Sequence, residues 1–546
     1  MPDTTAKKRR LVFLTVNSSF SHSSLALPLL HSACRELDNW EWVRYDMTIA
    51  QDIMGAVSDI NALDGDLLVT TLYLFNRETA LNVLQRCHAL APECRIAVGG
   101  PECLGGGAGE LQRRYPWLDR IFRGEGEALF RNYLDSFDAP APPSPIVPPD
   151  SNGEYAEWSD SDFPVNDPFF VTDKPFAQME TSRGCPIGCF YCTSGGTHPR
   201  YRSISHVREE LSLLRARGVK ELRLLDRTFN LPQERGAALL RLFREEFPQM
   251  RFHLELHPQF LNEAVKDELR QALPGQLHIE TGIQCLDQEV QRLSGRRSAV
   301  PAVLEGMKFL CSLSAFETHA DLLAGLPGQK WSHILEDTAT LMTLGVAEIQ
   351  LEVLKILPGT PMVNIAPCHG IRYSASTPYD VMRTDTMSLE EIRLSRDLSR
   401  LLDMSYNNSY LHGVVSEMNK GCPEFVPQLL RYFHKAGGNA AAIWDLQKRF
   451  VFLHGFCMEH DLHECARLLA FQWLMAGFPP EQGADRYSVK SVPPPADARL
   501  QTGSEACLNA RETRFRTLET EEKLCYFAFN RSFALNRPAA VWEKEK

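Results

Sequence analysis

Short apolar runs alternate with segments of helical period through most of this sequence, from residue 8 to about residue 360. This alternation constrains the fold because parallel strands cannot be joined by tight hairpins and need crossover connections, which are usually helices. Residues 8–138 hold five such runs, which predict an α/β domain with a doubly wound, Rossmann-like parallel sheet covered by helices on both faces. Ligands of such sheets bind at the carboxyl ends of the strands, which correspond here to Asn17–His22, Thr71–Asn76, Gly99–Glu102 and Arg123–Glu127.

A proline-rich stretch separates this domain from a second series of alternating segments. Residues Ala139–Asp150 contain six prolines in twelve positions, and such a run acts as a semi-rigid spacer rather than a helix or a central strand. We therefore expect a linker at residues 139–165. Residues 166–360 hold six further strand–helix units, which predict a partial (β/α)6 barrel of the TIM type with functional groups at the strand ends. Residues 361–546 are expected to form a mainly helical C-terminal region.

The composition limits the compartment and the partners of the chain. A net charge of −11 gives no overall field that attracts a polyanion, so nucleic acid is not an expected partner. The fifteen cysteines are too sparse for a disulfide framework. The apolar run at residues 11–16 is too short for a signal peptide or a membrane span. We expect a cytoplasmic protein that acts on a small molecule or a peptide without a membrane partner.

The strongest functional signal is a group of three cysteines, Cys185, Cys189 and Cys192, in the string TSRGCPIGCFYC. Their CxxxCxxC spacing places three thiolates on one short loop, one fewer than the four cysteines that usually hold a four-iron cluster. One iron would be left open, and an open metal position lets a substrate or cofactor bind. The alternative is a structural zinc site, because His198 follows closely enough to complete a Cys3His set.

The motif closely resembles the signature of the radical S-adenosylmethionine (SAM) superfamily, with Gly184 and Pro186 beside the first cysteine and Tyr191 before the last. The resemblance implies that the three cysteines hold a [4Fe–4S] cluster whose open iron binds SAM. It also implies that an external low-potential donor reduces the cluster, which then releases a 5′-deoxyadenosyl radical. In this family, residues at the barrel strand ends contact SAM, and the resemblance gives that role to Tyr191, Asp226, Gly282 and Gln284.

Two strings of the first domain, VGGPE at 98–102 and RGEGE at 123–127, resemble the cobalamin-binding domain of one large class of radical SAM enzymes. Glycines in such strings let the backbone approach a bulky ligand. The other interpretation is a pair of tight strand-to-helix turns in a domain without a ligand. The resemblance implies that cobalamin contacts His22, Thr71, Gly99, Gly100, Pro101, Gly124 and Glu125.

His22 departs from the pattern of that class. Many of its domains carry an Asp-x-His-x-x-Gly string after the first strand, and the histidine of this string replaces the lower ligand of cobalt. The comparable stretch here is FSHSSL at 20–25, which keeps His22 but lacks the aspartate and the glycine. Without the aspartate, nothing would orient the imidazole ring. We favour His22 as a helix-start residue over a cobalt ligand.

The C-terminal region carries a further resemblance in the string CHGIRYSASTPYDVMRTDTMS, which starts at Cys368. It is similar to an uncharacterised extension found on one branch of cobalamin-binding radical enzymes. Its position suggests a lid over the barrel mouth that would shield a radical from solvent. The candidate substrate contacts in it, which could equally be packing and surface groups, are Arg372, Tyr373, Tyr379 and Arg383.

The sequence therefore predicts a cobalamin-dependent radical SAM enzyme that acts on an unactivated carbon, most simply a C-methyltransferase. The same cofactors could instead serve a cyclisation, a rearrangement or an oxidation. A transfer-RNA methylthiotransferase would need a second cluster and a basic terminal module, which the sequence does not indicate. The cysteines considered for that second cluster, which do not fall at the expected strand ends, are Cys34, Cys87, Cys94 and Cys103. An iron–sulfur sensor is the non-enzymatic alternative.

Overall fold

The computed structural model describes residues 8–140, 144–148, 163–478, 493–503, 513–519, 523–530, 538 and 540–545. Much of the expected linker at 139–165 therefore lies outside the described residues. The chain divides into two compact units. The first comprises Met1–Thr318, Gly325–Gln329 and Val353–Leu389, and the second comprises His319–Ala324, Lys330–Glu352 and Glu390–Lys546.

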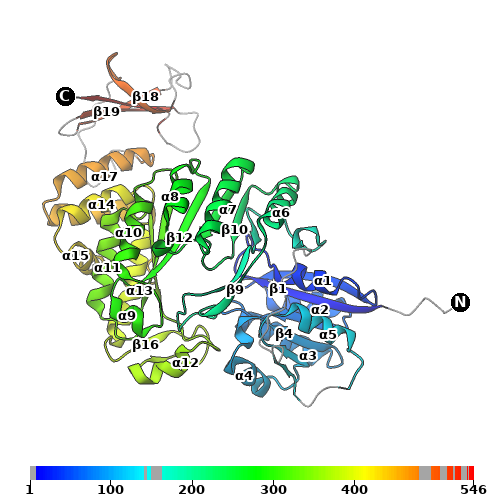
Figure 1. Cartoon of the computed structure of the whole chain (residues 1–546). Helices are drawn as coiled ribbons and strands as arrows, with labels where there is room; N and C mark the ends of the chain where they lie inside the picture. The colour runs from blue at the N-terminus through cyan, green and yellow to red at the C-terminus, as the bar shows by residue number, and fades with distance from the viewer. Residues whose placement is uncertain are drawn as a thin grey trace. The chain divides into compact units, whose positions relative to one another are not determined.

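The N-terminal part of the first unit is a six-stranded sheet with helices on both faces (Figure 1). Its strands are β1 Arg9–Asn17, β2 Trp40–Thr48, β3 Leu67–Thr71, β4 Arg95–Gly99, β5 Arg120–Phe122 and β6 Ile146–Val147. Its helices are α1 Ala26–Cys34, α2 Ile53–Ala62, α3 Arg77–Leu90, α4 Gly106–Arg114 and α5 Glu127–Asp135, with a short 3-10 turn at Pro101–Cys103. The strand order is β2-β1-β3-β4-β5-β6, and every neighbouring pair is parallel.

Alternating apolar residues explain why this sheet is covered on both sides. In β1, Leu11 and Phe13 pack with α1 and α5 on one face, whereas Val12 and Leu14 pack with α2, α3 and α4 on the other. Both faces are therefore buried, as in a doubly wound parallel sheet. The predicted fold of this domain is confirmed. The short sixth strand, β6, comes from the segment that the sequence analysis assigned to the linker.

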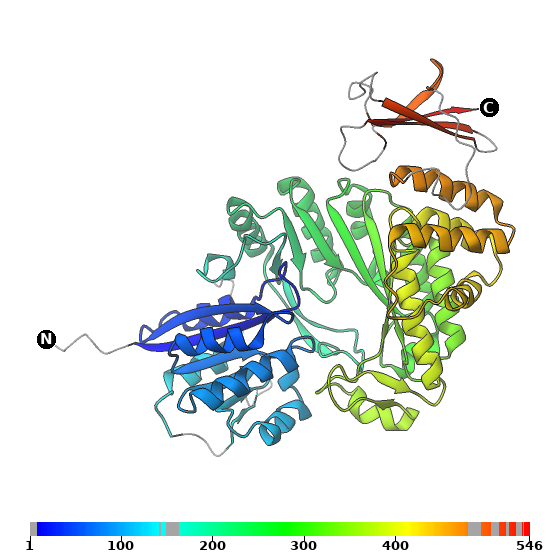
Figure 2. The ribbon, with the colours of Figure 1, turned by 180° about the vertical axis from the view of Figure 1, so that it is seen from behind.

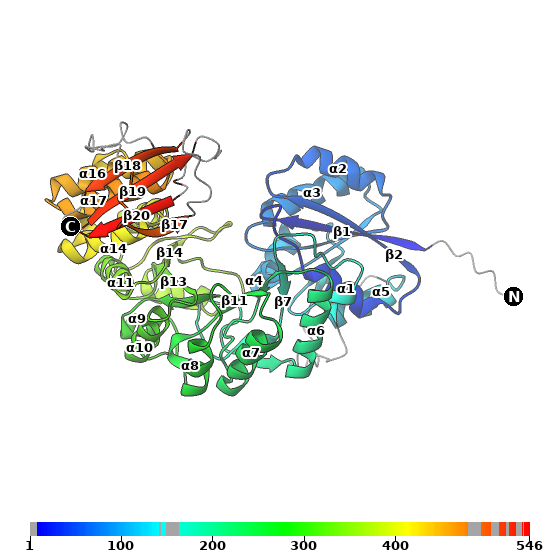
Figure 3. The ribbon, with the colours of Figure 1, turned by 90° about the horizontal axis from the view of Figure 1, so that it is seen from above.

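The second sheet also has six strands, and helices follow the first five of them along the chain. The strands are β7 Ala177–Met179, β10 Glu221–Leu224, β11 Arg251–Glu255, β12 Leu277–Gln284, β13 Glu317–Ala324 and β14 Glu348–Val353, in the order β14-β13-β12-β11-β10-β7. The helices are α6 Ile204–Ala216, α7 Gln233–Glu246, α8 Glu263–Arg270, α9 Gln288–Leu293, α10 Val300–Cys311 and α11 Trp331–Leu344. Figure 3 shows α6, α7 and α8 side by side along one side of this sheet. A six-stranded sheet with helices between its successive strands agrees with the predicted partial barrel.

An antiparallel hairpin interrupts the alternation after β7. It consists of β8 Ser182–Cys185 and β9 Thr197–Tyr201. The sequence analysis did not predict this hairpin, because its strands are short and polar. The three motif cysteines lie on or directly after β8, so the hairpin fixes both ends of the cysteine-bearing loop.

The C-terminal region contains both helices and strands. In the first unit it begins with α12 Met362–Ile365, a 3-10 turn at Ala366–His369, and the pair β15 Arg372–Tyr373 and β16 Val381–Arg383. Helices then follow as predicted, namely α13 Leu389–Met404, α14 His412–Gly421, α15 Phe425–Lys435, α16 Leu446–Glu459 and α17 His463–Met475. No helix among the described residues is long and apolar enough to cross a membrane.

The last described residues form an antiparallel sheet that the sequence analysis did not predict (Figure 2). Its strands are β17 Arg499–Gly503, β18 Thr513–Glu519, β19 Lys523–Asn530 and β20 Ala540–Glu545, in the order β17-β20-β19-β18. Tyr526 and Trp542 share one core, whereas Phe527 packs against Phe471 of α17, with ring centroids 5.2 Å apart. This alternation is typical of a strand with two different faces.

Candidate active site

The three motif cysteines share one loop between β8 and β9, residues 185–196, which we call the cluster loop. Cys185 and Cys189 are buried and Cys192 is half-buried. The hydroxyl of Thr228 lies 3.3 Å from Cys185 Sγ. The backbone N–H of Ser194 donates to Cys192 Sγ over 3.4 Å. The N–H beside Cys192 Sγ stabilises the thiolate of that cysteine, which is the form that binds a metal.

The alternative of a zinc site with His198 finds no support in this geometry. Among the described residues, no three His, Cys, Asp or Glu side chains are gathered closely enough to hold one metal ion. The Cys3His tetrahedron with His198 is therefore not formed. Thiolates that each bind a different iron of a cluster do not have to converge on one point. The arrangement of the cluster loop is compatible with a [4Fe–4S] cluster.

Arg296 is a residue of this site that the sequence analysis missed. Its guanidinium donates to Cys189 Sγ over 3.4 Å and also to the carbonyl oxygen of Gly282. The phenol of Tyr191 lies near the side chains of Arg296 and Cys189. Burial, followed by the charge of Cys189, raises the pKa of this phenol well above its usual value. Arg296 thus gathers three predicted residues around one fixed positive charge. Its sequence signal was only a pair of adjacent arginines, which is typical of a protein surface.

Two further predicted SAM contacts lie at strand ends. Asp226 follows β10, and its buried carboxylate accepts hydrogen bonds from the N–H groups of Thr181 at 2.7 Å and Ser182 at 3.0 Å. The carboxylate therefore ties the end of β10 to the backbone that enters β8. Gln284 is the last residue of β12 and has a positive φ of 69°. Contact of Asp226 and Gln284 with SAM stays a prediction.

A cavity of about 460 Å³ lies between the carboxyl ends of the first sheet and the cluster loop. Its lining from the first sheet includes six of the seven predicted cobalamin residues, which are Thr71, Gly99, Gly100, Pro101, Gly124 and Glu125. Its lining from the barrel side includes Thr193, Ser194, Thr197, His198 and Arg227. An apolar wall is supplied by Leu25, Leu29, Leu30 and Phe130. A ligand in this cavity would touch the first domain and the cluster loop at once.

Gly100 shows that the backbone of the cavity wall has no room for a side chain. Its φ is 98°, and a Cβ on it would lie 2.7 Å from the carbonyl oxygen of Leu72. Residues other than glycine rarely adopt this conformation. The turn at 98–102 therefore presents bare backbone to the cavity, as the resemblance to a ligand-binding turn implies.

Charged residues connect the 123–127 loop to the β8–β9 hairpin. Arg183 of β8 pairs with Glu125 at 3.3 Å, with Glu127 at 2.8 Å and with Glu180 at 2.8 Å. Arg200 of β9 also donates to Glu125, over 3.1 Å. Burial disfavours the charge of Arg183, but the three carboxylates outweigh it and raise the pKa of the guanidinium. This network fixes the loop with the predicted cobalamin contacts to the hairpin that carries the cysteines.

His22 lies outside the cavity. It lines a smaller pocket of about 90 Å³, where its Nδ1 is 2.8 Å from Ser19 Oγ. Its ring packs edge-on against Phe176, with centroids 5.3 Å apart. Burial, followed by the charge of Arg223, lowers its pKa. These contacts place His22 in the loop before α1, whose N-cap is Leu25, and both interpretations of His22 stay predictions.

The cysteines that a second cluster would need are separated by the first sheet. Cys34 packs on the face covered by α1, whereas Cys87 and Cys103 pack on the opposite face. Burial raises the pKa of Cys34 and Cys103 to about 12 and that of Cys87 to about 11. These thiols are neutral packing groups, which argues against the methylthiotransferase alternative.

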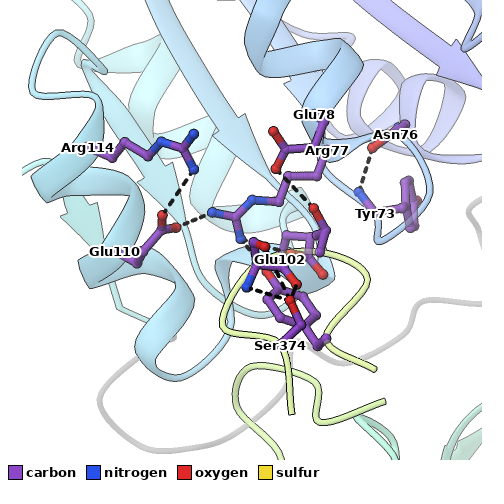
Figure 4. Close-up of polar contacts among 11 residues, drawn as sticks. Tyr73, Asn76, Arg77, Glu78, Glu102, Glu110, Arg114 and Ser374 are labelled. Carbon is purple, nitrogen blue, oxygen red and sulfur yellow. Dashed lines mark hydrogen bonds and ion pairs between the residues drawn. The ribbon is translucent and has the colours of Figure 1, made fainter. Parts of the chain in front are cut away.

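The candidate substrate contacts of the C-terminal region do not line the cavity. Arg372 and Arg383 are exposed, and Tyr373 is half-buried. Tyr379 is buried, and its hydroxyl donates to Glu102 Oε2 over 2.7 Å. This hydrogen bond to the 98–102 turn fits the alternative given above, in which Tyr379 is a packing group, and substrate contact by Tyr379 stays a prediction. Figure 4 shows the polar contacts around Arg77 and Glu102 to which this interaction belongs.

His257, at the end of β11, is a further buried polar group of the barrel. Its Nδ1 accepts a hydrogen bond from the N–H of Gln259 at 3.3 Å. Its Nε2 has no partner among the described residues. Burial, followed by the charge of Arg296, lowers its pKa to about 3, so the ring is neutral near pH 7. A buried N–H donor without a protein partner is available to a ligand.

Comparisons with known proteins agree with this site. Residues 179–341 match the model of the radical SAM superfamily, and residues 368–479 match a protein of unknown function, DUF4080. The first match covers the cluster loop and four of the six barrel strands, β10 to β13, and begins at the last residue of β7. The chain is thus an enzyme of the radical SAM class. The second match covers the region in which the sequence resembles an uncharacterised extension.

Relatives with assigned names are methyltransferases. An uncharacterised methyltransferase of Pyrococcus horikoshii is 23% identical over 382 residues, which cover 64% of this chain and 80% of the relative. The 2-(S-pantetheinyl)-carbapenam-3-carboxylate methyltransferase of Streptantibioticus cattleyicolor is 23% identical over 376 residues, 61% of this chain. The alignment spans only 55% of that second relative.

Two solved structures share the fold. The radical SAM methyltransferase TsrM from Kitasatospora setae, with tryptophan and a SAM analogue bound, has a TM-score of 0.53 and 16% identity over 68% of this chain and 79% of its own. The cobalamin-dependent SAM radical enzyme OxsB, with aqua-cobalamin and SAM bound, has a TM-score of 0.54 and 13% identity over 88% of this chain and 77% of its own. These matches show that the chain shares its fold with both enzymes.

Proposed function

We propose that this protein is a cobalamin-dependent radical SAM enzyme that methylates an unactivated carbon of a small molecule or a peptide. One observation carries the proposal: the cavity of about 460 Å³ is lined by the glycine-containing turns of the first sheet and by the cluster loop. A cofactor held at the strand ends would therefore face the metal site directly. We also propose residues 8–138 as the cobalamin domain, 166–360 as the radical SAM barrel and 361–546 as the C-terminal extension.

The residues of the chain suit these cofactors. Cys185, Cys189 and Cys192 would hold three irons, which leaves the fourth iron for SAM. Tyr191 and Gly282, gathered around Arg296, would border SAM together with Gln284. When bound, the cluster with SAM supplies a 5′-deoxyadenosyl radical and cobalamin supplies a methyl group.

The protein contributes orientation and exclusion of water. The Arg183 network holds the 123–127 loop against the hairpin, so the two halves of the cavity keep a fixed spacing. Burial raises the pKa of Glu180 although Arg183 opposes this effect. The wall formed by Leu29, Leu30 and Phe130 is apolar and would exclude water from that side of the cavity.

The experiment is anoxic reconstitution with iron, sulfide and hydroxocobalamin, followed by incubation with SAM and a chemical reductant. Methyl transfer predicts both 5′-deoxyadenosine and S-adenosylhomocysteine. Formation of 5′-deoxyadenosine alone would instead favour a cyclisation, rearrangement or oxidation with the same cofactors. If neither product forms while the cluster is intact, the proposed function is wrong.

A further inference from the structure

The loop at residues 374–380, in the C-terminal region, reaches the turn at 98–102 of the first domain, and both belong to the first unit. Tyr379 donates its hydroxyl hydrogen to Glu102 Oε2 over 2.7 Å. Arg77 Nη1 donates to the same carboxylate oxygen over 3.0 Å and also to the Tyr379 hydroxyl. Three side chains from three separate segments therefore close one polar triangle. Figure 4 labels two of them, Arg77 and Glu102.

The triangle is buried and its charges are balanced. The side chains of Arg77 and Glu102 are only 5% and 3% exposed. Arg77 also pairs with Glu110 of α4, and Glu110 lies 3.8 Å from Arg114. Two guanidinium groups thus face two carboxylates. Because removing one partner of a buried pair leaves the others uncompensated, the triangle should open only at considerable cost.

The backbone holds the 374–380 loop in place from its other side. Tyr379 O accepts a hydrogen bond from Ile356 N at 3.1 Å, and Val381 N donates to Leu354 O at 2.9 Å. Tyr379 itself has a φ of 60°, a conformation that non-glycine residues adopt only where the surroundings enforce it. The loop is therefore anchored to the segment after β14, and the hydroxyl of Tyr379 binds Glu102 of the first domain.

A second close contact lies beside the first. A Cβ on Gly105 would lie 2.3 Å from Gly359 Cα, so the two backbones touch directly. Gly105 follows the 98–102 turn, and Gly359 follows the segment that holds the 374–380 loop. The turn that lines the cavity is thus clamped at Glu102 and again at Gly105.

We propose that the 374–380 loop positions the 98–102 turn for cobalamin, and that Tyr379 is the positioning residue. The part of the C-terminal region that belongs to the first unit would then support the cofactor-binding turn. The inference rests on the proposed binding of cobalamin in the cavity. Gly99, Gly100 and Pro101 line the cavity, whereas Tyr379 does not, so Tyr379 acts through Glu102.

The expected effect follows from preorganisation. A cavity whose turn is already held needs no ordering when the ligand binds, whereas a loosened turn occupies the binding-competent conformation only part of the time. Loss of a buried hydrogen bond to a charged group typically shifts such an equilibrium by about tenfold. Tyr379→Phe should therefore raise the dissociation constant for hydroxocobalamin by up to about tenfold.

Tyr133→Phe is a matched control. Tyr133 is also buried in the first domain, and its hydroxyl donates to a carboxylate, that of Asp119, over the same distance of 2.7 Å. It does not line the cavity. Both variants lose one tyrosine–carboxylate hydrogen bond, so both should lower the unfolding temperature. Only Tyr379→Phe should weaken cobalamin binding.

The test is a spectral titration of the full chain with hydroxocobalamin, combined with amide hydrogen exchange of the apoprotein. The structure gives hydrogen bonds from Glu102 N to Leu72 O and from Cys103 N to Gly100 O, so both amides report on the turn. We expect these amides to exchange faster in Tyr379→Phe and not in Tyr133→Phe. Should Tyr379→Phe fail to fold, Glu102→Gln replaces it with the same expectation.

The outcomes separate this inference from the proposed function. An unchanged dissociation constant in Tyr379→Phe, with a lowered unfolding temperature, would mean that Tyr379 is merely structural and would overturn the inference. Equal weakening by both variants would overturn it as well. If the wild type itself does not bind hydroxocobalamin, the proposed function fails. The positioning role would in that case be rejected separately, by unchanged amide hydrogen exchange at Glu102 and Cys103 in Tyr379→Phe.

Discussion

Gly100→Ala is the substitution that most sharply separates a ligand-binding turn from an ordinary one. The added Cβ would lie 2.7 Å from Leu72 O and 3.0 Å from Leu72 N, in the middle of the backbone that follows β3. A non-glycine residue in this region of φ and ψ costs about 1–3 kcal/mol. Overpacking against a fixed backbone costs about 1–3 kcal/mol more. The free energy of unfolding of the first unit should therefore fall by about 2–6 kcal/mol.

Gly106→Ala provides the control for this prediction. Gly106 begins α4 a few residues later, and a Cβ on it would meet nothing within 4 Å. Alanine is favoured over glycine in a helix by up to about 1 kcal/mol, so this variant should be neutral or slightly more stable.

The assay is urea unfolding of both apoproteins, followed by a hydroxocobalamin titration of each. We expect Gly100→Ala to unfold at a lower urea concentration and to lose most of its cobalamin affinity, since relieving the clash must move the turn or β3. Gly106→Ala should match the wild type in both measurements. Equal stability and equal affinity of the two variants would refute our account of the turn.

Three further predictions concern the barrel and its network. Cys189→Ala should lose the iron–sulfur absorption of the reconstituted protein, whereas Cys457→Ala, a buried thiol of α16, should keep it; iron and sulfide analysis checks this. Because the pKa of His257 is about 3 in the folded state and about 6.5 in the unfolded state, its contribution to stability is complete above pH 6.5. Below pH 6.5 the free energy of unfolding should fall by about 1.4 kcal/mol per pH unit because of this histidine. Unfolding of the apoprotein between pH 7 and pH 5 should show this fall, and the fall should be smaller in His257→Asn. Arg183→Met should lower stability by about 1–3 kcal/mol near pH 7, since the half-buried carboxylates of Glu127 and Glu180 lose this partner; the urea midpoint should recover partly where Glu180 becomes protonated.

The sequence predicted the elements that are encoded by local pattern. The first sheet was predictable because Leu11 to Leu14 and the later runs are apolar on both faces, which is typical of a buried parallel strand. The cluster loop was predictable because three cysteines in CxxxCxxC spacing have few structural explanations. The turn at Gly99 and Gly100 was also visible, because adjacent glycines after a strand indicate a special backbone.

The contacts that were missed join residues far apart in the chain. Tyr379 and Glu102 are separated by 277 positions, and neither residue is unusual in its own string. Arg296 meets Cys189 only because β12 and the following helix return to the cluster loop. The C-terminal sheet was missed because its strands are partly charged and β19 is apolar on both faces, so period-2 patterning is weak there.

The most direct test of the account is the metal and product analysis of anoxically purified protein. We predict about four irons and four inorganic sulfides per chain, and release of 5′-deoxyadenosine from SAM after chemical reduction, with both lost in Cys189→Ala. Stoichiometric zinc without inorganic sulfide, together with intact SAM after reduction, would contradict the central claim.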